Sequence, residues 1–211
     1  MSVTVITSGL MVRWEPGTRE RLQAAAMDLY ISRGFDRTTT ADIAQAVGLT
    51  ERTFFRHFTD KREVLLGGQE LLERAFLDGV AAAAPDASPL EIVESALSAV
   101  ATFFPAERRD HSGRRQRIIS ESPALREREP LKSARPATAV AAALRSRGVP
   151  EVTATLAAES GVTVFGVAFA TWIADGEERS FPDLEREVLG RLVALAADVT
   201  RRDRRSDGST G

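Results

Sequence analysis

The stretch that decides the fold is TTADIAQAVGLTERTFFRHF, residues 39 to 58. Two helices that cross steeply through a short turn need a small residue at the crossing and a glycine in the turn. Ala44 and Gly48 meet these needs. The apolar residues that can face a preceding helix are Ile43, Val47, Leu49 and Phe54. The stretch therefore predicts a helix-turn-helix, a motif that places its second helix in the major groove of DNA.

Capping residues place the boundaries of both helices. Thr39 with Asp42 forms a capping box, and Thr50 caps the second helix. The first turn of this second helix then points outward, toward the groove. Arg52 can donate two hydrogen bonds to guanine, which discriminates between bases by about 1 to 3 kcal/mol. The residues expected to face bases or nearby phosphates are Thr50, Glu51, Arg52 and Thr53.

Phosphate contacts are expected beside this turn. Amide groups at helix starts attract anions, and hydroxyl or cationic side chains there fix the register of the duplex without reading its sequence. The side chains expected in this role are Thr39, Thr40, His57 and Lys61. Residues 1 to 62 carry 9 basic and 7 acidic side chains, and residues 63 to 211 carry 19 and 23. Recognition of DNA must therefore depend on individual side chains at defined positions rather than on a high overall positive charge.

The remaining chain is predicted to be helical. Ala occurs 32 times and strand-like alternation is rare. Thr18 is expected to cap a first helix that Gly34 ends, with a buried face of Leu22, Ala26 and Leu29. Caps, prolines and glycines then predict helices at about 61–84, 88–104, 108–119, 122–148, 150–175 and 180–200. Pro130 and Pro136 should break or kink the segment that contains them. The predicted fold class is all-α, with about nine helices.

Composition excludes several kinds of site. The chain has 211 residues, 28 basic and 30 acidic side chains and no cysteine, so thiol catalysis, cysteine-ligated zinc and disulfides are ruled out. The two histidines, His57 and His111, lie far apart in different contexts, which argues against a metal site or a catalytic triad. Neither a membrane span nor a signal peptide is expected. We therefore predict a cytoplasmic protein that is not an enzyme and uses no metal or cofactor.

Residues 18 to 63 resemble the TetR/AcrR family of bacterial transcriptional regulators. The resemblance rests on RGF at 33–35, TTTADIAQAVGLTERTFFRHF at 38–58 and DKREVL at 60–65. It implies a three-helix DNA-binding head on a larger helical body that dimerises and binds a small ligand. Phe55 departs from the family, which usually has a tyrosine there with its hydroxyl on a phosphate. Here the ring alone would pack against sugar.

The body is similar to a narrower group. The segment RRQRIISESPALRERE, residues 114–129, resembles the body of regulators of the mycofactocin type, which implies an acyl-CoA-like effector. Five arginines nearby could steer such an anion or simply form a solvated helix face. They are Arg108, Arg109, Arg114, Arg115 and Arg117.

The helix expected at 150–175 is apolar all round and should be buried on more than one side. Its small-residue stripe, with a stripe on the last helix, could form a four-helix dimer interface. These residues are Gly161, Val164, Ala168, Thr171, Leu184, Val188, Leu192, Leu195 and Val199. An aromatic stripe on the same helix could line a ligand pocket with other apolar residues, or could be plain core. These residues are Phe76, Phe103, Phe104, Ile118, Leu144, Phe165, Phe169 and Trp172.

The predicted organisation is a DNA-binding head at 16–62 and a ligand-binding and dimerisation body at 63–200, between disordered tails at 1–15 and 201–211. Gly67 and Gly68 weaken the joining helix and could act as a hinge. The predicted function is a homodimeric repressor that leaves a palindromic operator when a small, hydrophobic or acyl-CoA effector binds. The alternatives are a helical small-molecule carrier or enzyme with a coincidental helix-turn-helix, and an architectural DNA binder without effector control.

Overall fold

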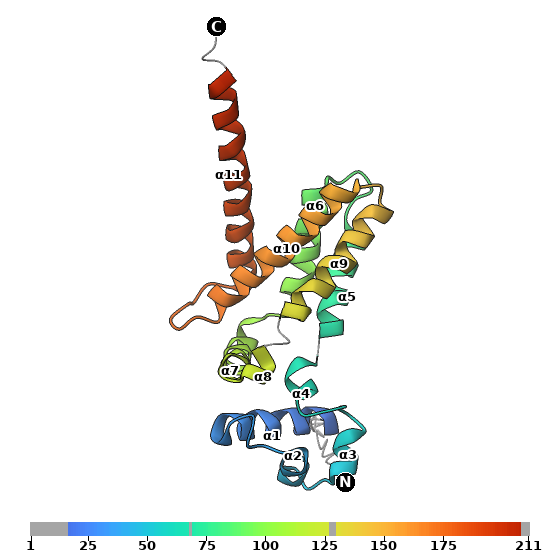
Figure 1. The fold of residues 1–211 in the computed structure, drawn as a ribbon, viewed down its shortest axis with the longest axis vertical. Helices are drawn as coiled ribbons and strands as arrows, with labels where there is room; N and C mark the ends of the chain where they lie inside the picture. Colours follow the sequence, from blue (N-terminus) through green and yellow to red (C-terminus); the bar gives the residue numbers. More distant parts are fainter. Residues whose placement is uncertain (1–16, 68, 127–129, 208–211) are drawn as a thin grey trace, which may run out of the picture. The chain divides into compact units, whose positions relative to one another are not determined.

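The computed structural model describes residues 17–67, 69–126 and 130–207 (Figure 1). Within these ranges the chain forms eleven α-helices, one 3-10 helix and no strand, so the all-α prediction is confirmed. There are more helices than predicted because two of the expected long helices are interrupted. The chain divides into two compact units, one up to Leu65 and one from Leu66. The predicted boundary at residues 62 and 63 lies slightly earlier.

The first unit contains α1 (Thr18–Arg33), α2 (Thr40–Ala46) and α3 (Glu51–Phe55). Apolar side chains from the three helices and the following turn share its core: Leu22, Ala26, Met27, Tyr30, Ile43, Phe54 and Phe58. The predicted cap Thr18 is wrong, because Thr18 is already helical and the extended Gly17 precedes it without a side-chain cap. Gly34 ends α1 as predicted, at a φ of 86° that favours glycine. Leu29 is only half-buried.

The helix expected at 61–84 is two helices, α4 (Glu63–Leu66) and α5 (Gln69–Ala82). Asp60 begins α4, since its Oδ1 accepts hydrogen bonds from the amides of Arg62 at 2.8 Å and Glu63 at 2.9 Å. The interruption falls at Gly67, which lies in a turn. Glycine is disfavoured in a helix by about 1 kcal/mol relative to alanine, and Gly68 lies outside the described residues.

Proline and serine set the next boundaries. Helix α6 (Pro89–Ala101) begins with the predicted capping box of Ser88 and Glu91. It ends before Phe104, earlier than expected, and the 3-10 helix η1 (Ala106–Arg108) leads into α7 (Arg109–Glu121). The segment expected at 122–148 is divided into α8 (Pro123–Arg126) and α9 (Pro130–Ser146).

The two prolines of this segment behave differently. Pro130 occupies the first position of α9, where a missing backbone N–H breaks no helical hydrogen bond. Pro136 lies inside α9, which continues through it, so a break at that position is wrong. Packing of α9 against α5 and α10 stabilises the helix there despite the lost hydrogen bond.

In the second unit α5, α6, α9 and α10 (Glu151–Trp172) pack side by side around one apolar core (Figure 1). Two glycines permit close approach. A Cβ on Gly79 would lie 2.5 Å from the Cα of Ala96, and one on Gly161 would lie 2.9 Å from Cγ1 of Val93. By length and composition α10 could cross a membrane. Its packing against α6, α9 and α11 accounts for the same apolar composition.

Helix α11 (Phe181–Asp207) packs against α10 and α6 and then continues away from them (Figure 1). It extends past the predicted end near Thr200 and reaches Asp207, within the segment 201–211 that was predicted to be a tail. The tail predicted at 1–15 and residues 208 to 211 lie outside the described part of the chain.

Candidate functional site

The first turn of α3 is held rigidly and faces solvent. Thr50 is its N-cap, and the Thr53 amide donates to Thr50 Oγ1 at 3.3 Å. Phe54 anchors the helix from below with no exposed surface. Arg52 is exposed and has no hydrogen-bond or ion-pair partner in the described part of the chain. The cap and the buried Phe54 hold the start of α3 in place, and the Arg52 guanidinium extends from it into solvent.

The start of α2 is tied to α3. Thr39 and Asp42 form the predicted capping box, and the hydrogen bonds from Thr39 lower the pKa of the Asp42 carboxyl. The Thr40 hydroxyl donates to the Glu51 carboxylate. Thr40 and Glu51, both predicted to face DNA, thus hold the angle between the two helices.

Lys61 has a different place from the one predicted. Its ammonium donates to the carbonyl oxygens of Phe35 at 2.8 Å and Thr38 at 2.9 Å, and lies 4.4 Å from the centre of the Phe35 ring. The Tyr30 hydroxyl donates to the Lys61 carbonyl at 2.7 Å. Lys61 therefore joins the loop before α2 to the loop before α4. A phosphate could recruit this ammonium only by competing with these bonds.

His57 and Phe55 border the same surface. The side chain of His57 is half-buried, and its backbone carbonyl accepts a hydrogen bond from Arg19 at 2.6 Å. Phe55 is 52% exposed and meets Phe54 edge to face at 5.5 Å between ring centres. An exposed ring of this kind can pack against a sugar, which is the contact expected of Phe55.

Sequence reasoning missed three arginines of the first unit. Arg19 stacks over Phe58 at 4.4 Å, and Arg21 donates to the Val47 carbonyl at 2.8 Å, so both attach α1 to the helix-turn-helix. Arg56 is exposed directly after α3. It follows Arg52 by four positions, a spacing that places two side chains on one helix face. The spacing of Arg52 and Arg56 could therefore have indicated from the sequence that Arg56 lies beside Arg52 on the DNA-facing surface.

The aromatic residues of the predicted ligand pocket contact one another. The Phe104 ring centre lies 4.9 Å from that of Phe181, 5.6 Å from that of Phe165 and 5.8 Å from that of Trp172. Phe169 joins this cluster, and Phe76 meets Phe165 edge to face. The other predicted pocket residues, Phe103, Ile118 and Leu144, are half-buried or buried, and Leu144 belongs to the main core. Several of these rings meet edge to face, and Phe103, Phe104, Phe165 and Phe169 remain half-buried.

The arginines of α7 and the turn before it do not form one cluster. The Arg109 guanidinium donates to the backbone carbonyls of Glu177 and Arg179 and lies 5.4 Å from the Trp172 ring, so it anchors the loop between α10 and α11. The side chains left exposed there are Arg108, Arg114 and Arg117. Partial burial lowers the pKa of His111, and the positive charges of Arg108, Arg114 and Arg115 lower it further.

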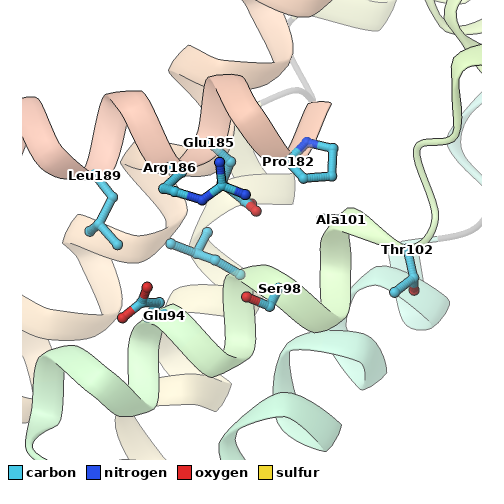
Figure 2. A pocket seen from close by; sticks show the side chains of 9 residues that line it. Glu94, Ser98, Ala101, Thr102, Pro182, Glu185, Arg186 and Leu189 are labelled. Carbon is cyan, nitrogen blue, oxygen red and sulfur yellow. The ribbon is translucent and has the colours of Figure 1, made fainter. Parts of the chain in front are cut away.

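A cavity of about 200 Å³ lies elsewhere, between α6 and α11 (Figure 2). None of its lining residues was predicted as part of a ligand site. Its most unusual member is Glu185, which is 5% exposed and whose Oε1 accepts no hydrogen bond from the described residues. Burial raises the pKa of this carboxyl to about 8. Glu185 directly follows Leu184 of the apolar stripe on the last helix, and this position could have indicated from the sequence that the carboxyl is buried.

The predicted dimer stripe on α10 faces the protein's own core. Gly161, Val164 and Ala168 are buried, since α6 and α11 cover this face. Thr171 is half-buried and bonds to the Val167 carbonyl. Of the predicted residues on α11, Leu184 is buried, Val188 and Leu192 are half-buried, and Leu195 is 67% exposed. The side chain of Val199 lies outside the described part of the chain.

The opposite face of α10 is apolar and exposed. The large exposed apolar side chains on α10 and α11 are Val152, Leu156, Val167, Val193 and Leu195. Val152, Leu156 and Val167 lie on one side of α10, whereas Val193 and Leu195, two positions apart, lie on different sides of α11.

Comparison with known families agrees with this arrangement. Residues 22–67 match the model of bacterial regulatory proteins of the tetR family, and residues 87–197 match that of the MftR C-terminal domain. The chain belongs to the TetR family. The tetR match spans the helix-turn-helix, and the MftR match spans the helices of the second unit from α6 to α11.

Relatives of this TetR-family chain match over part of their length. The HTH-type transcriptional regulator TcmR of Streptomyces glaucescens is 37% identical over 92 residues, 44% of this chain and 41% of TcmR. The nucleoid occlusion factor SlmA of Vibrio vulnificus is 39% identical over 61 residues, 29% of this chain and 31% of SlmA. The chain thus spans less than half the length of these relatives.

A solved structure shares the fold. SmeT, the repressor of the Stenotrophomonas maltophilia multidrug efflux pump SmeDEF, is 17% identical with a TM-score of 0.52, over 85% of this chain and 90% of SmeT. At this identity the likeness concerns the arrangement of helices alone.

Proposed function

We propose that this chain is a ligand-responsive transcriptional regulator that binds a palindromic DNA operator as a homodimer and acts by binding, without catalysis. The observation that carries the proposal is Arg52, an exposed and unpartnered guanidinium on a capped first turn. Such a turn can enter a major groove, where arginine pairs with the O6 and N7 atoms of guanine. The rigid links of Thr40 to Glu51 and of Lys61 to Phe35 limit how far the turn can rotate.

Phosphate contacts would flank the base-reading turn. Arg56 and Phe55 are exposed at the end of α3, and Thr39 is exposed at the start of α2. Together they offer a cation, a ring and a helix start to the DNA backbone. His57 and Thr53 are half-buried nearby and complete the proposed surface. Lys61 contributes by shaping the loops rather than by meeting phosphate.

Dimerisation would use the exposed apolar face of α10 and α11. Val152, Leu156 and Val167 lie along one side of α10, and Leu195 is the most exposed of the large apolar side chains described on α11. A two-fold axis would bring the same face of two copies together, which gives a four-helix interface. It would also present two α3 helices to successive major grooves, roughly 34 to 36 Å apart.

The effector would be an acyl-CoA-like molecule that releases the operator, so that the protein acts as a repressor. The match of residues 87–197 to the MftR C-terminal domain agrees with the resemblance to mycofactocin-type regulators from which this effector class is inferred. Exposed Arg108, Arg114 and Arg117 could pair with its phosphates. The break at Gly67 would serve as the hinge through which binding changes operator affinity.

The DNA assignment is tested by fluorescence anisotropy on the operator upstream of the gene and on random duplex DNA, over a salt series. Arg52→Ala should weaken operator binding by about 1 to 3 kcal/mol and relax preference at one base pair. Arg56→Ala should weaken both duplexes alike and reduce the salt dependence. Arg126→Ala, an exposed arginine of α8, is the control and should change neither. Equal losses on both duplexes for Arg52→Ala would contradict the base-reading role.

The effector proposal has its own test. A medium-chain acyl-CoA should release wild-type protein from the operator, while free CoA and the free fatty acid should not. Gly67→Ala with Gly68→Ala should leave operator binding intact and blunt this release. Release that is unchanged in the double variant would refute the hinge. No release by any of the three compounds would refute the effector class without affecting the DNA assignment.

A further inference from the structure

The cavity between α6 and α11 contains a buried carboxyl group, that of Glu185 on α11. Glu185 is 5% exposed, and its Oε1 accepts no hydrogen bond from the described residues. Figure 2 shows its side chain directed from α11 into the space facing α6. A buried polar atom without a hydrogen bond is costly, so such an atom in a native protein calls for an explanation, such as a water molecule, an ion or a ligand that pairs with it.

The surroundings favour a cation. Glu94 lines the cavity from α6, and Ser98 adds a hydroxyl. Arg186 also lines the cavity. Its guanidinium forms an ion pair with Asp183 at 2.9 Å, so its positive charge is already matched by that carboxylate. The cavity is therefore lined by two carboxyl groups, those of Glu94 and Glu185, and by one guanidinium that is already paired with Asp183.

The walls favour an apolar group of limited size. Leu97 and Leu189 line the cavity from the two helices. Its volume of about 200 Å³ is below the 300 to 1,000 Å³ typical of drug-sized pockets. At about 30 Å³ for each water molecule, it holds the equivalent of roughly seven waters. A ligand of about eight non-hydrogen atoms fits this space.

We propose that the cavity between α6 and α11 is a binding site for a small organic ammonium compound, whose charge pairs with Glu185 and whose apolar part packs on Leu97 and Leu189. The ammonium supplies the donor that Glu185 Oε1 lacks. Ser98 and Glu94 lie at the rim, where they can accept a second N–H. None of the proposed effector contacts Arg108, Arg114 and Arg117 lines this cavity, so the site does not depend on the proposed effector class.

Proton linkage gives this site a signature. Burial raises the pKa of Glu185 to about 8, so the carboxyl is largely protonated at neutral pH and must lose its proton when an ammonium binds. The charged groups facing it are Glu94 on α6 and Arg186 on α11. Affinity for an ammonium should therefore rise as the pH increases from about 6 to about 8.

The test uses the full chain, labelled with nitrogen-15, titrated with benzylamine and with benzyl alcohol as a neutral compound of the same shape. Benzylamine should shift the amides of α6 and α11 with a dissociation constant of about 1 mM, the strength expected of so small a ligand. Benzyl alcohol should bind at least about tenfold more weakly. Glu185→Gln should weaken benzylamine binding by at least about tenfold and remove its pH dependence.

Two further variants separate the site from a folding effect. Ser98→Phe fills the cavity from its exposed side, leaves Glu185 in place and should abolish benzylamine binding. Glu70→Gln removes an exposed carboxylate of α5 and should leave binding unchanged. The proposal is overturned if benzyl alcohol binds as well as benzylamine, if Ser98→Phe or Glu185→Gln binds with wild-type affinity, or if the shifted amides lie outside α6 and α11.

Discussion

The close approach of α5 and α6 makes Gly79→Ala a sharp test of the packing. The Gly79 carbonyl accepts a hydrogen bond from Ser95 Oγ at 2.7 Å, so the two helices touch at this residue. A Cβ there would lie 2.5 Å from the Cα of Ala96 and 2.6 Å from the carbonyl oxygen of Ser95. Both are backbone atoms, which cannot rotate away as a side chain can.

The magnitude follows from these distances. Carbon atoms normally stay about 3.5 to 4.0 Å apart, so the helices must separate by roughly 1 Å. Overpacking of this kind costs about 3 kcal/mol, the upper part of its usual range, since backbone must move. Alanine returns about 1 kcal/mol of helix propensity. The net loss is about 2 kcal/mol, and for a chain of this size it lowers the Tm by about 4 to 8 °C.

The matched control is Gly113→Ala in α7. A Cβ there meets no atom closer than the Ile173 carbonyl oxygen at 3.8 Å, an ordinary contact. The same substitution should therefore raise stability by about 1 kcal/mol. Thermal unfolding followed by circular dichroism, at one protein concentration for all variants, gives the comparison. The packing argument fails if Gly79→Ala is as stable as the wild type or gains stability as Gly113→Ala does.

Substitutions at three other residues each test the contribution of a single side chain. Burial raises the pKa of Glu185 to about 8, so the folded chain holds a proton that the unfolded chain releases, and stability should fall as the pH rises toward that value. Between about pH 5 and pH 8 the loss is roughly 3 kcal/mol. In urea unfolding, the free energy of unfolding of Glu185→Gln should not show this pH-dependent loss. The same pH profile for Glu185→Gln and the wild type would refute the assignment to Glu185. Lys61→Met should destabilise the first unit by about 1.5 to 3 kcal/mol, because charged hydrogen bonds to the Phe35 and Thr38 carbonyls are lost. Faster amide exchange without DNA would reveal this, whereas wild-type exchange with weakened DNA binding would restore the phosphate role. Thr50→Ala should cost about 1 kcal/mol and Thr50→Ser almost nothing, as measured by thermal unfolding, and equal effects would exclude the cap.

Local signals explain why so much of the first unit was predictable. The capping box of Thr39 and Asp42, the Thr50 cap and the positive φ of Gly34 each involve residues within a few positions of one another. Side-chain caps and left-handed glycines depend on local backbone geometry, which the sequence encodes directly. The hydrogen bonds of Lys61 could not be predicted, because its partners, Phe35 and Thr38, are distant in the chain and only the folded loops bring them together.

Periodicity predicted α10 and α11 but not which of their faces is inside. An amphipathic pattern identifies buried and exposed sides only when one side is polar, and α10 is apolar all round. Gly161 was assigned to a dimer interface, yet Val93 of α6 occupies that side. The aromatic stripe was assigned to a pocket, and only the folded chain shows that Phe181 of α11 contacts Phe165 and Trp172 on it.

The sequence by itself determined the helices, most of their ends and the outward turn that carries Arg52, because these depend on contacts within a few residues. The tertiary structure alone decided that Lys61 bonds to the loop before α2, that Phe181 packs on the aromatic stripe, and that Glu185 is buried in a cavity between α6 and α11. These properties arise from residues far apart in the chain. Their burial and their partners exist only once the helices have packed.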